Sequence, residues 1–504
     1  MITAYDTVVY PNLCQVQTHP DRLAVVANLF GLDPAPPERC RVLEIGCGDG
    51  SNLLPLAAAF PESSFVGIDL ASTRVEAGRA AIAELGILNF EISASNILSY
   101  PLEGEGFDYI IAHGVYSWVP DAAKDRLLAI CKGRLALHGI AYVSYNCLPG
   151  CHVRRMTRDI MRFHTRQVED PVERVRQSVA VCRFVANSIE QPDAYRQLFK
   201  EQLEQIERRP SSSFIHDDLA EINDPVYFHE FAACAGRHGL QYLGEADFAE
   251  MYDYSFSDQA RQILGQMEDN RLTREQYLDF VQCRRFRQTL LTHHEAAIKY
   301  PPEAAAVERF HISSQANSVV AGSADGGQPI ERFANARGGA LETSHPLAVR
   351  AFHRLRDRWP ATVSFEELFQ STAADAGVPP ALWGAKRGEL MQILLEAYRV
   401  KVVDFRRTPV HCATAPSACP ATSRFARWQL KRSFTVTTLR HDNLRIEDEL
   451  GKRLLLLMDG TRPLADLARD MAAEPVAAAA SGGISNESVA NEVTKLAGLA
   501  LLEA

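Results

Sequence analysis

The sequence predicts an α/β fold with a mostly parallel sheet in its first part and α-rich units at its C-terminal end. In the first part, short apolar segments alternate with helical patterns. This alternation is typical of a parallel sheet whose crossover helices lie on its faces. From residue 345 onward the order changes, because several helical patterns come before each apolar strand. Helices that lead into such a strand are typical of a winged-helix unit.

Five strands are expected in the first part, because each is a short run of apolar and β-branched residues. They are the segments 41–45, 64–69, 89–93, 107–113 and 139–144. The helical patterns between them are 52–60, 72–85 and 122–135. A further helix and strand around 227–243 are expected to complete the same sheet. Residues from about 151 to 215 are then a mostly helical, arginine-rich insertion.

The remaining chain is expected to divide by composition. The sheet domain spans 1–255 and a helical region spans 256–312. Residues 313–344 are rich in Ser, Gly and Ala with few aromatic residues, which is typical of a linker. Winged-helix-like units are expected over 345–407 and 425–504, and the linker indicates that they fold semi-independently.

Composition argues against several functional classes. The chain has 504 residues and a formal net charge of -10, whereas a protein that coats nucleic acid needs a basic surface, so no nucleic-acid partner is expected. Eleven scattered cysteines form no disulfide framework and favour reduced thiols in the cytoplasm. Residues 1–19 show no secretory signal, and no window reaches the roughly 18 consecutive apolar residues of a membrane span. No membrane insertion is expected.

The strongest motif is a glycine-rich turn between a strand and a helix, Leu43-Glu44-Ile45-Gly46-Cys47-Gly48-Asp49-Gly50. Glycines let the backbone approach a ligand, and the helix N-terminus offers free N–H groups, so a nucleotide cofactor is expected. The spacing is G-x-G-x-G instead of the dinucleotide pattern G-x-G-x-x-G. Glu44 would repel a pyrophosphate, but it suits the cationic amino group and sulfonium of S-adenosylmethionine.

Asp69 ends the second strand and supports the same prediction. A carboxylate at this place can accept hydrogen bonds from both ribose hydroxyls. A tight turn without a ligand is the alternative, but it leaves Glu44, the glycines, Asp69 and five correctly spaced strands as a coincidence.

These residues resemble the class I methyltransferase family, whose catalytic domain is Rossmann-like. Three further motifs resemble a bacterial subfamily with a methyltransferase regulatory region, which includes the rickettsial protein-lysine methyltransferases. They are Tyr5-Asp6 with Tyr10-Pro11 and Gln17 to Leu23, then His113 to Pro120, and then Ser144 to Gly150. The resemblance covers about residues 1–300 well, and 345–504 resembles the winged-helix tail of those lysine enzymes more faintly.

The resemblance implies a set of residues for S-adenosylmethionine. The methionine part would be held by Glu44, Gly46, Gly48 and Gly50, the ribose by Asp69 with Leu70 beside it, and the adenine by Ser95 and Asn96. The family often has Asp where Asn96 stands. Tyr10, Gln17 and His19 would form an N-terminal cover, and His113 to Tyr116 would line the space between the methionine part and the acceptor.

Side chains after the fourth and fifth strands are expected to act on the acceptor. Tyr116 and Trp118 follow a strand end, where α/β enzymes place their sites, and aromatic faces attract methylammonium or sulfonium groups by roughly 0.5–2 kcal/mol. His113 is a candidate base or hydrogen-bond donor, and Tyr145 and Asn146 are candidates for acceptor contact. Ordinary packing in the core is the alternative for each.

No metal site is expected. Two Cys/His groups offer too few ligands, namely Cys147, Cys151 and His152, and His411, Cys412 and Cys419. His293-His294-Glu295 lacks the H-E-x-x-H spacing. Two arginine clusters, 154–158 and 284–287, either steer an acidic partner or lie on solvated helix faces.

The leading hypothesis is an S-adenosylmethionine-dependent methyltransferase that modifies a protein side chain, with lysine as the candidate. A lysine acceptor, whose reference pKa is near 10.4, loses its proton more easily in a dry, aromatic entrance. One alternative is a small-molecule acceptor, with the tail as a regulatory or partner-binding module. The other is a cofactor-binding scaffold without catalysis. The oligomeric state is left open.

Overall fold

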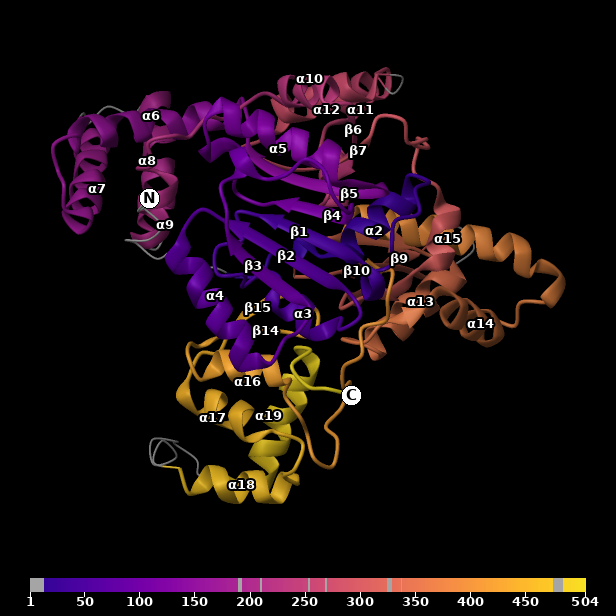
Figure 1. The fold of residues 1–504 in the computed structure, drawn as a ribbon. Helices are drawn as coiled ribbons and strands as arrows, with labels where there is room; N and C mark the ends of the chain where they lie inside the picture. The colour runs from indigo at the N-terminus through magenta and orange to yellow at the C-terminus, as the bar shows by residue number, and fades with distance from the viewer. Residues whose placement is uncertain are drawn as a thin grey trace.

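A seven-stranded sheet is the centre of the fold (Figure 1). The computed structural model describes residues 13–188, 193–208, 211–252, 254–267, 270–323, 329–336, 338–474 and 484–504. The strands of the sheet are β1 Arg41–Ile45, β2 Ser64–Asp69, β3 Phe90–Ala94, β4 Phe107–Ala112, β5 Leu135–Asn146, β6 Leu240–Glu245 and β7 Phe286–His293. Their order is β3-β2-β1-β4-β5-β7-β6. The first five run parallel, as the alternation of strands and helices predicted.

Strand β7 was missed by the sequence analysis, which expected helix throughout 256–312. Helices α11 Asp258–Gly265 and α12 Arg271–Gln282 do lie there, but β7 follows them and pairs antiparallel with both β5 and β6. Arg287 lies in this strand and belongs to the arginine cluster 284–287, for which a solvated helix face was one expectation. Its side chain is instead fully buried among carboxylates. The sheet therefore extends beyond residue 255, where we expected its domain to end.

Each face of the sheet has its own core, because strand residues alternate between faces. In β4, Ile110 and Ala112 face a core closed by α5 Asp121–Arg134 and α10 Phe228–Arg237. Tyr109 and Ile111 face a second core, closed by α2 Pro20–Leu29 and α3 Leu54–Ala59. Helix α4 Ser72–Leu85 packs beside β3 at the edge of the sheet.

The arginine-rich insertion forms four helices that stand at one side of the sheet (Figure 1). They are α6 Gly150–His164, α7 Pro171–Asn187, α8 Ala194–Glu207 and α9 Ser211–Asp217. Met161, Cys182, Phe199 and Phe214 form a separate small core between them. We call these four helices the helical arm.

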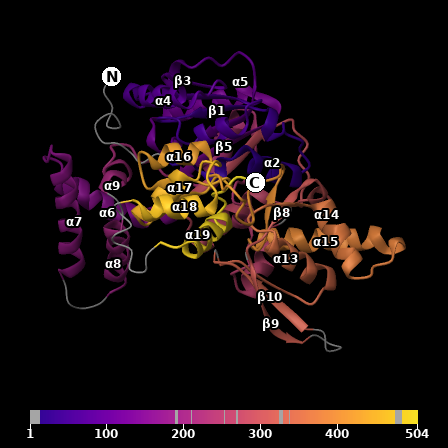
Figure 2. The ribbon, with the colours of Figure 1, turned by 90° about the horizontal axis from the view of Figure 1, so that it is seen from below.

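Residues 313–344 are not a linker. They contain β9 Asn317–Ser323, β10 Pro329–Ala334 and β11 Ala340–Thr343, which form an antiparallel sheet that projects away from the main one (Figure 2). Almost all of β9 is exposed, so its composition is that of a loop. Phe333 of β10 anchors the sheet by packing against Phe352, with ring centroids 4.8 Å apart.

The first winged-helix-like unit shares its core with the seven-stranded sheet. Its helices and strands are α13 Pro346–Asp357, β12 Val363–Ser364, α14 Phe365–Asp375, α15 Trp383–Arg399 and β13 Asp404–Arg406. The two strands pair on either side of β8 His311–Ser313, which precedes the expected linker. Their apolar residues belong to the same buried cluster as α2, β1 and β4. This unit is therefore not semi-independent, because its removal would expose the core beneath the sheet.

The last unit has a core of its own. It comprises α16 Arg424–Leu430, β14 Thr435–Thr437, β15 Asn443–Arg445, α17 Glu449–Leu457, α18 Leu464–Ala472 and α19 Asn486–Gly498. Phe425 and Trp428 of α16 also pack against the core beneath the sheet. Polar contacts add to this junction, including the bond from Trp359 Nε1 to the Gly498 carbonyl at 3.0 Å and the ion pair of Arg432 with Glu84. In the part of the chain that the structure describes, no helix is long and apolar enough to cross a membrane.

The shared core predicts that the first winged-helix-like unit and the sheet unfold together. Phe405 is fully buried between Phe310 and Tyr398, with ring centroids 5.3 and 4.5 Å away. We expect Phe405→Ala to lower the free energy of unfolding by about 3–5 kcal/mol, the usual cost of such a cavity. Denaturant unfolding followed by fluorescence and by loss of cofactor binding should give one transition.

Phe163→Ala is the matched control, because Phe163 is 70% exposed on the helical arm and its loss should change little. Two separate transitions for Phe405→Ala would contradict a shared core.

Candidate active site

Glu44 lies at the end of β1 with its carboxylate buried. One oxygen, Oε1, accepts a hydrogen bond from Asn52 Nδ2 at 2.8 Å. The other, Oε2, is buried without a hydrogen-bond partner among the described residues. Burial, together with the charges of Asp69 and Asp49, raises the pKa of Glu44 to about 8. An unpaired buried carboxylate oxygen is costly, so this position fits a cationic donor from a ligand.

The glycine loop that follows turns with positive φ at each of its three glycines, Gly46, Gly48 and Gly50. A Cβ at Gly46 would come within 2.6 Å of the Val115 side chain, and one at Gly50 within 2.7 Å of the Phe90 ring. The loop is therefore possible only with glycine at these two positions. Its first N–H groups bind the end of β2, since Gly46 N and Cys47 N donate to the Ile68 carbonyl at 2.8 and 3.1 Å.

Asp69 closes the other side of the loop. Its Oδ2 accepts a hydrogen bond from Gly48 N at 2.8 Å, and its Oδ1 accepts one from Ala71 N at 2.8 Å. The carboxylate is thus fixed at the end of β2 and keeps free lone pairs. Leu70 beside it is 49% exposed and offers an apolar surface.

Ser95 and Asn96 follow β3, the neighbour of β2. Ser95 N donates to the Asp69 carbonyl at 2.8 Å, which places this turn against the end of β2. Asn96 is exposed, and its Oδ1 already accepts from Leu98 N at 2.9 Å. Its amide N–H groups stay available, so its contact with the adenine stays a prediction.

Asn52 was not singled out as a site residue, yet it joins the site to the N-terminal segment. Besides its bond to Glu44, it donates to Thr18 Oγ1 at 3.0 Å and accepts from Gln15 N at 2.7 Å. Sequence alone placed it at the start of a helix. The signal in the sequence was its position two residues after Gly50, directly beyond the glycine loop.

Residues of the expected N-terminal cover lie in different places. Gln17 is half-buried in a short helical turn, Val16–Thr18, which Asn52 holds. His19 is buried at the start of α2, against Phe60 and against His441 of the last unit. Tyr10 lies outside the described residues.

His113 follows β4 and belongs to a chain of hydrogen bonds. Tyr142 OH donates to Gln288 Oε1 at 2.8 Å, so its oxygen is left to accept from His113 Nδ1, 3.0 Å away. Burial lowers the pKa of His113 to about 4. His113 is therefore neutral at pH 7, and its Nε2 keeps a lone pair. The neighbouring Phe286 is 37% exposed, so this end of the sheet borders solvent.

The aromatic residues after β4 and β5 are more deeply buried than expected. Tyr116 is 3% exposed, and its ring packs between Tyr145 and Phe231, at centroid distances of 5.9 and 5.1 Å. Tyr145 is buried too, and its hydroxyl pairs with Thr289 at 3.0 Å. Both rings therefore pack in the core, which was the alternative for them. Trp118 is half-buried and stays a candidate for acceptor contact.

Asn146 ends β5 and is bonded to the loop that precedes α10. Its Nδ2 donates to Asn223 Oδ1 at 3.1 Å, and its backbone N donates to Ser117 Oγ at 2.9 Å. Its contact with the acceptor stays a prediction. The two hydrogen bonds show that residues 117, 146 and 223 form one layer at the carboxyl end of the sheet.

The remaining polar clusters are explained by local structure. Cys147 and Cys151 donate to the carbonyls of Arg284 and Arg285, at 3.2 and 3.1 Å. Arg287 forms a buried ion network with Glu245, Glu275 and Asp279, so this arginine cluster does not lie on a solvated helix face. No group of three or more His, Cys, Asp or Glu in the described ranges is arranged to hold a metal.

Comparison with known proteins gives the family. The model of a methyltransferase domain matches residues 42–139, a predicted methyltransferase regulatory domain matches 210–293, and the C-terminal winged-helix domain of PKMT matches 419–499. An uncharacterised protein of Rickettsia prowazekii is 37% identical over 241 residues, which are 48% of this chain and 96% of that protein. The chain belongs to the class I S-adenosylmethionine-dependent methyltransferases of the rickettsial type.

A solved member of the family has the same fold along nearly the whole chain. PKMT2 of Rickettsia typhi, in complex with AdoHcy, is 26% identical with a TM-score of 0.85, over 98% of this chain and 99% of that one. Another uncharacterised protein of Rickettsia prowazekii is 35% identical over 309 residues, 61% of this chain. The chain spans just over half the length of that relative, 56%.

The methyltransferase is thus an enzyme whose cofactor is S-adenosylmethionine, and the site fits this group. The unpaired oxygen of Glu44 suits the ammonium of the methionine part, and Asp69 suits the ribose hydroxyls. Two residues that line this region were missed by the sequence analysis. Tyr142 and Gln288 orient His113, but Gln288 lies on the unpredicted strand β7 and gave no signal.

The raised pKa of Glu44 predicts that cofactor affinity depends on pH. Below about pH 8 the free protein holds a proton on Glu44, and this proton must leave before an ammonium group can bind. We therefore expect AdoHcy to bind more tightly as the pH rises from about 6 to about 7.5, with release of a proton. Calorimetry in buffers of different ionisation enthalpy measures both effects.

Glu44→Gln is the matched variant. It should bind AdoHcy more weakly by about 1.5–3 kcal/mol and without this pH dependence. At pH values above the raised pKa, ionised Glu44 destabilises the cofactor-free fold. At these pH values Glu44→Gln should therefore raise the Tm of the free protein. An unchanged pH dependence would mean that another group binds the ammonium.

Asn52→Ala should also weaken cofactor binding, because it leaves Glu44 without its donor and detaches residues 15–18. We expect a loss of about 1.5–3 kcal/mol in AdoHcy binding, measured by calorimetry. Asn89→Ala is the control, because the Asn89 side chain also makes three hydrogen bonds, here to the carbonyls of Ala57, Phe60 and Ser63, away from the loop. Equal affinities of the two variants would remove Asn52 from the site.

Proposed function

We propose that this methyltransferase transfers the methyl group of S-adenosylmethionine to the ε-amino group of lysine in a protein acceptor. The observation that supports the proposal is the likeness to PKMT2 over 98% of the chain, which includes both C-terminal units. The last unit also matches the winged-helix domain named for PKMT. A small-molecule enzyme needs neither unit for its chemistry.

S-adenosylmethionine supplies a methyl group that the sulfonium has already activated for displacement. The protein then has to align the acceptor and exclude water, and it needs no metal for this step. His113 is suited to orient an amine, because it is neutral and its Nε2 can accept an N–H hydrogen bond. A pKa of about 4 is too low for His113 to take the proton of a lysine ammonium, so its role in this proposal is to orient the neutral amine.

Tyr142 and Gln288 contribute to this arrangement as positioning residues. Their hydrogen bonds fix which His113 nitrogen has the proton, and therefore which one faces the acceptor as a lone pair. Phe286 beside the histidine ring provides an apolar, partly exposed surface. Such a surface favours a neutral amine over an ammonium ion.

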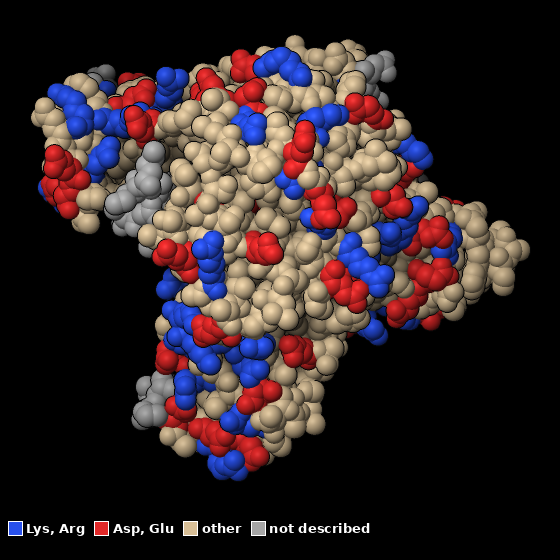
Figure 3. Space-filling model, in the orientation of Figure 1, with Lys and Arg blue, Asp and Glu red and all other residues tan. Residues whose placement is uncertain are grey.

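The partners that we propose follow from the same features. The acceptor is a polypeptide, and no nucleic-acid partner is proposed, since the net charge is -10 and acidic and basic residues are mixed over the face in Figure 3. All eleven cysteines are free thiols, which supports a cytoplasmic location.

The acceptor class is tested by incubating the enzyme with label-bearing S-adenosylmethionine and a bacterial lysate. We expect the label in the protein fraction, as Nε-methyl-lysine after hydrolysis and mass spectrometry. His113→Ala should lower kcat by about tenfold or more with a smaller effect on AdoHcy affinity, because it removes an oriented acceptor. Thr494→Ala is the control, because its exposed hydroxyl on α19 donates only to the Ala490 carbonyl.

Label confined to small molecules would overturn the protein-acceptor proposal and favour the small-molecule alternative. Absence of transfer to any fraction, with AdoHcy binding intact, would favour the scaffold alternative.

A further inference from the structure

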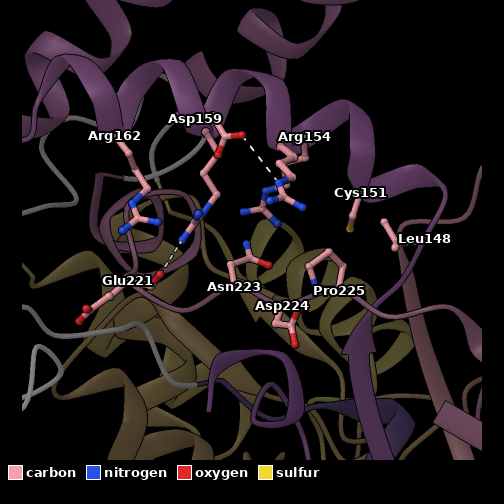
Figure 4. Close-up of a pocket in the computed structure, with 11 residues that line it drawn as sticks. Leu148, Cys151, Arg154, Asp159, Arg162, Glu221, Asn223, Asp224 and Pro225 are labelled. Carbon is pink, nitrogen blue, oxygen red and sulfur yellow. Dashed lines mark hydrogen bonds and ion pairs between the residues drawn. The ribbon is translucent and has the colours of Figure 1, made fainter. Parts of the chain in front are cut away.

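A pocket of about 250 Å³ lies between the helical arm and the loop that precedes α10 (Figure 4). Helix α6 lines one side with Arg154, Arg155, Arg158 and Arg162. The loop residues Asn223, Asp224 and Pro225 line the other side, and Leu148 and Cys151 line the end nearest β5. This pocket plays no part in the cofactor site.

The arginines of α6 are spaced so that their charges gather on one face. Arg154, Arg158 and Arg162 are four residues apart, and side chains at this spacing are neighbours on a helix. Like charges at this spacing destabilise a helix. Their concentration beside a pocket is therefore explained better by a ligand than by helix stability.

The carboxylates around the pocket neutralise only part of this charge. Arg154 Nε pairs with Asp218 at 2.8 Å, and Arg155 pairs with Asp159 at 3.7 Å. The carboxylate of Asp224 accepts from Lys124, outside α6. Figure 4 shows the Glu221 carboxylate turned away from α6.

Two guanidinium groups are left without a carboxylate partner among the described residues. Arg158 is 7% exposed and donates only to the carbonyls of Ala220 and Glu221, and its Nε has no hydrogen-bond partner. Arg162 forms no ion pair within the described ranges. Burial, together with the charge of Arg162, lowers the pKa of Arg158 to about 10, and the nearby charges of Asp159 and Asp218 oppose this shift only in part.

The pocket adjoins the acceptor side of the active site. Asn223, which lines it, is bonded to Asn146 at the end of β5, and Asp224 N donates to the Ser117 carbonyl at 2.9 Å. Ser117 lies in the segment that follows β4, directly before the half-buried Trp118. A polypeptide bound across the carboxyl ends of β4 and β5 would therefore pass from one site to the other.

We propose that this arginine pocket binds an acidic side chain of the polypeptide acceptor and so selects lysines that have Glu or Asp nearby. The inference rests on the proposed function, because it concerns the same acceptor. Guanidinium groups bind carboxylates through paired, charge-assisted hydrogen bonds. The apolar side chains of Leu148 and Pro225 can contact the methylene groups of a glutamate, and the pocket is of side-chain size.

The test uses synthetic peptides that contain one lysine, with a single Glu placed at a different position near the lysine in each peptide. Each Glu peptide is compared with a peptide that has Gln at the same position. With the wild-type enzyme, we expect kcat/KM for the best Glu peptide to exceed that of its Gln counterpart by about tenfold or more, less so at high salt. In Arg158→Gln/Arg162→Gln the ratio should fall to about one, with AdoHcy affinity unchanged. Arg162→Gln alone, which leaves the carbonyl bonds of Arg158 intact, should lower the ratio in part.

Arg176→Gln/Arg183→Gln is the matched control, since it removes two arginines from α7 of the same arm, 69% and 61% exposed. It should keep the Glu preference. The proposal is overturned by an equal rate for Glu and Gln peptides in the wild type, or by a preference that survives in Arg158→Gln/Arg162→Gln. A phosphoserine peptide that outperforms every Glu peptide would reassign the pocket to phosphate.

A second readout does not depend on methyl transfer. A fluorescent Glu-containing peptide without lysine should bind the AdoHcy complex of the wild type, and anisotropy should show weaker binding to Arg158→Gln/Arg162→Gln. Arginine-dependent binding without transfer to any lysine peptide would support the pocket and contradict the proposed function. Transfer to lysine without arginine-dependent binding would support the proposed function and contradict the pocket.

Discussion

The carboxylate of Glu44 is the constraint on which the cofactor site depends. It is buried at the end of β1, it has one donor in Asn52, and its second oxygen has no partner among the described residues. A fold tolerates such an arrangement only where a ligand supplies the missing donor, because an ionised group without one is costly to bury. The structure lowers this cost by letting Glu44 take up a proton, as its pKa of about 8 indicates. The site is therefore built for a cation and stays neutral until one arrives.

Asn52 links Glu44 to the N-terminal segment, which in turn contacts the last unit. Asn52 holds Gln15 and Thr18 by hydrogen bonds. The preceding residue, Cys14, is bonded to the last unit. The Cys14 thiol donates to the His441 carbonyl at 3.2 Å, and Asn443 Nδ2 donates to the Cys14 carbonyl at 2.7 Å. Burial raises the pKa of Cys14 to about 12, so the thiol keeps its proton and remains a donor. Buried charges add to this junction, since Arg440 pairs with Asp404 of β13 at 2.7 Å, which also pairs with Arg22 of α2. The winged-helix units therefore support the cofactor site as well as extending the surface beside it.

Local patterns predicted the parts of the fold that depend on local sequence, and they failed where distant pairing decides. The five parallel strands, the glycine loop, Glu44 and Asp69 were found because spacing and residue type determine them. Strand β7 was missed because its pairing with β5 and β6, and the Glu245 carboxylate of β6 that buries Arg287, come from distant parts of the chain. Residues 313–344 have the composition of a linker because β9 faces solvent, so their strands give no apolar pattern. The burial of Tyr116 was not predicted because it comes from Phe231 of α10, more than a hundred residues away, and its role toward the acceptor stays a prediction. The roles of Asn52 and Gln288 likewise follow from partners that only the folded chain brings near.

The bond between Cys14 and Asn443 joins residues 429 positions apart. Contacts between such distant positions form late, since the whole intervening chain has to be closed into a loop first. During synthesis, the glycine loop and the parallel strands can assemble long before residue 443 has left the ribosome. The segment that braces Asn52 and Glu44 gains its final support only afterwards. A chain that has not yet reached residue 443 therefore has the cofactor residues without their brace, and full affinity for S-adenosylmethionine requires the contacts of His441 and Asn443.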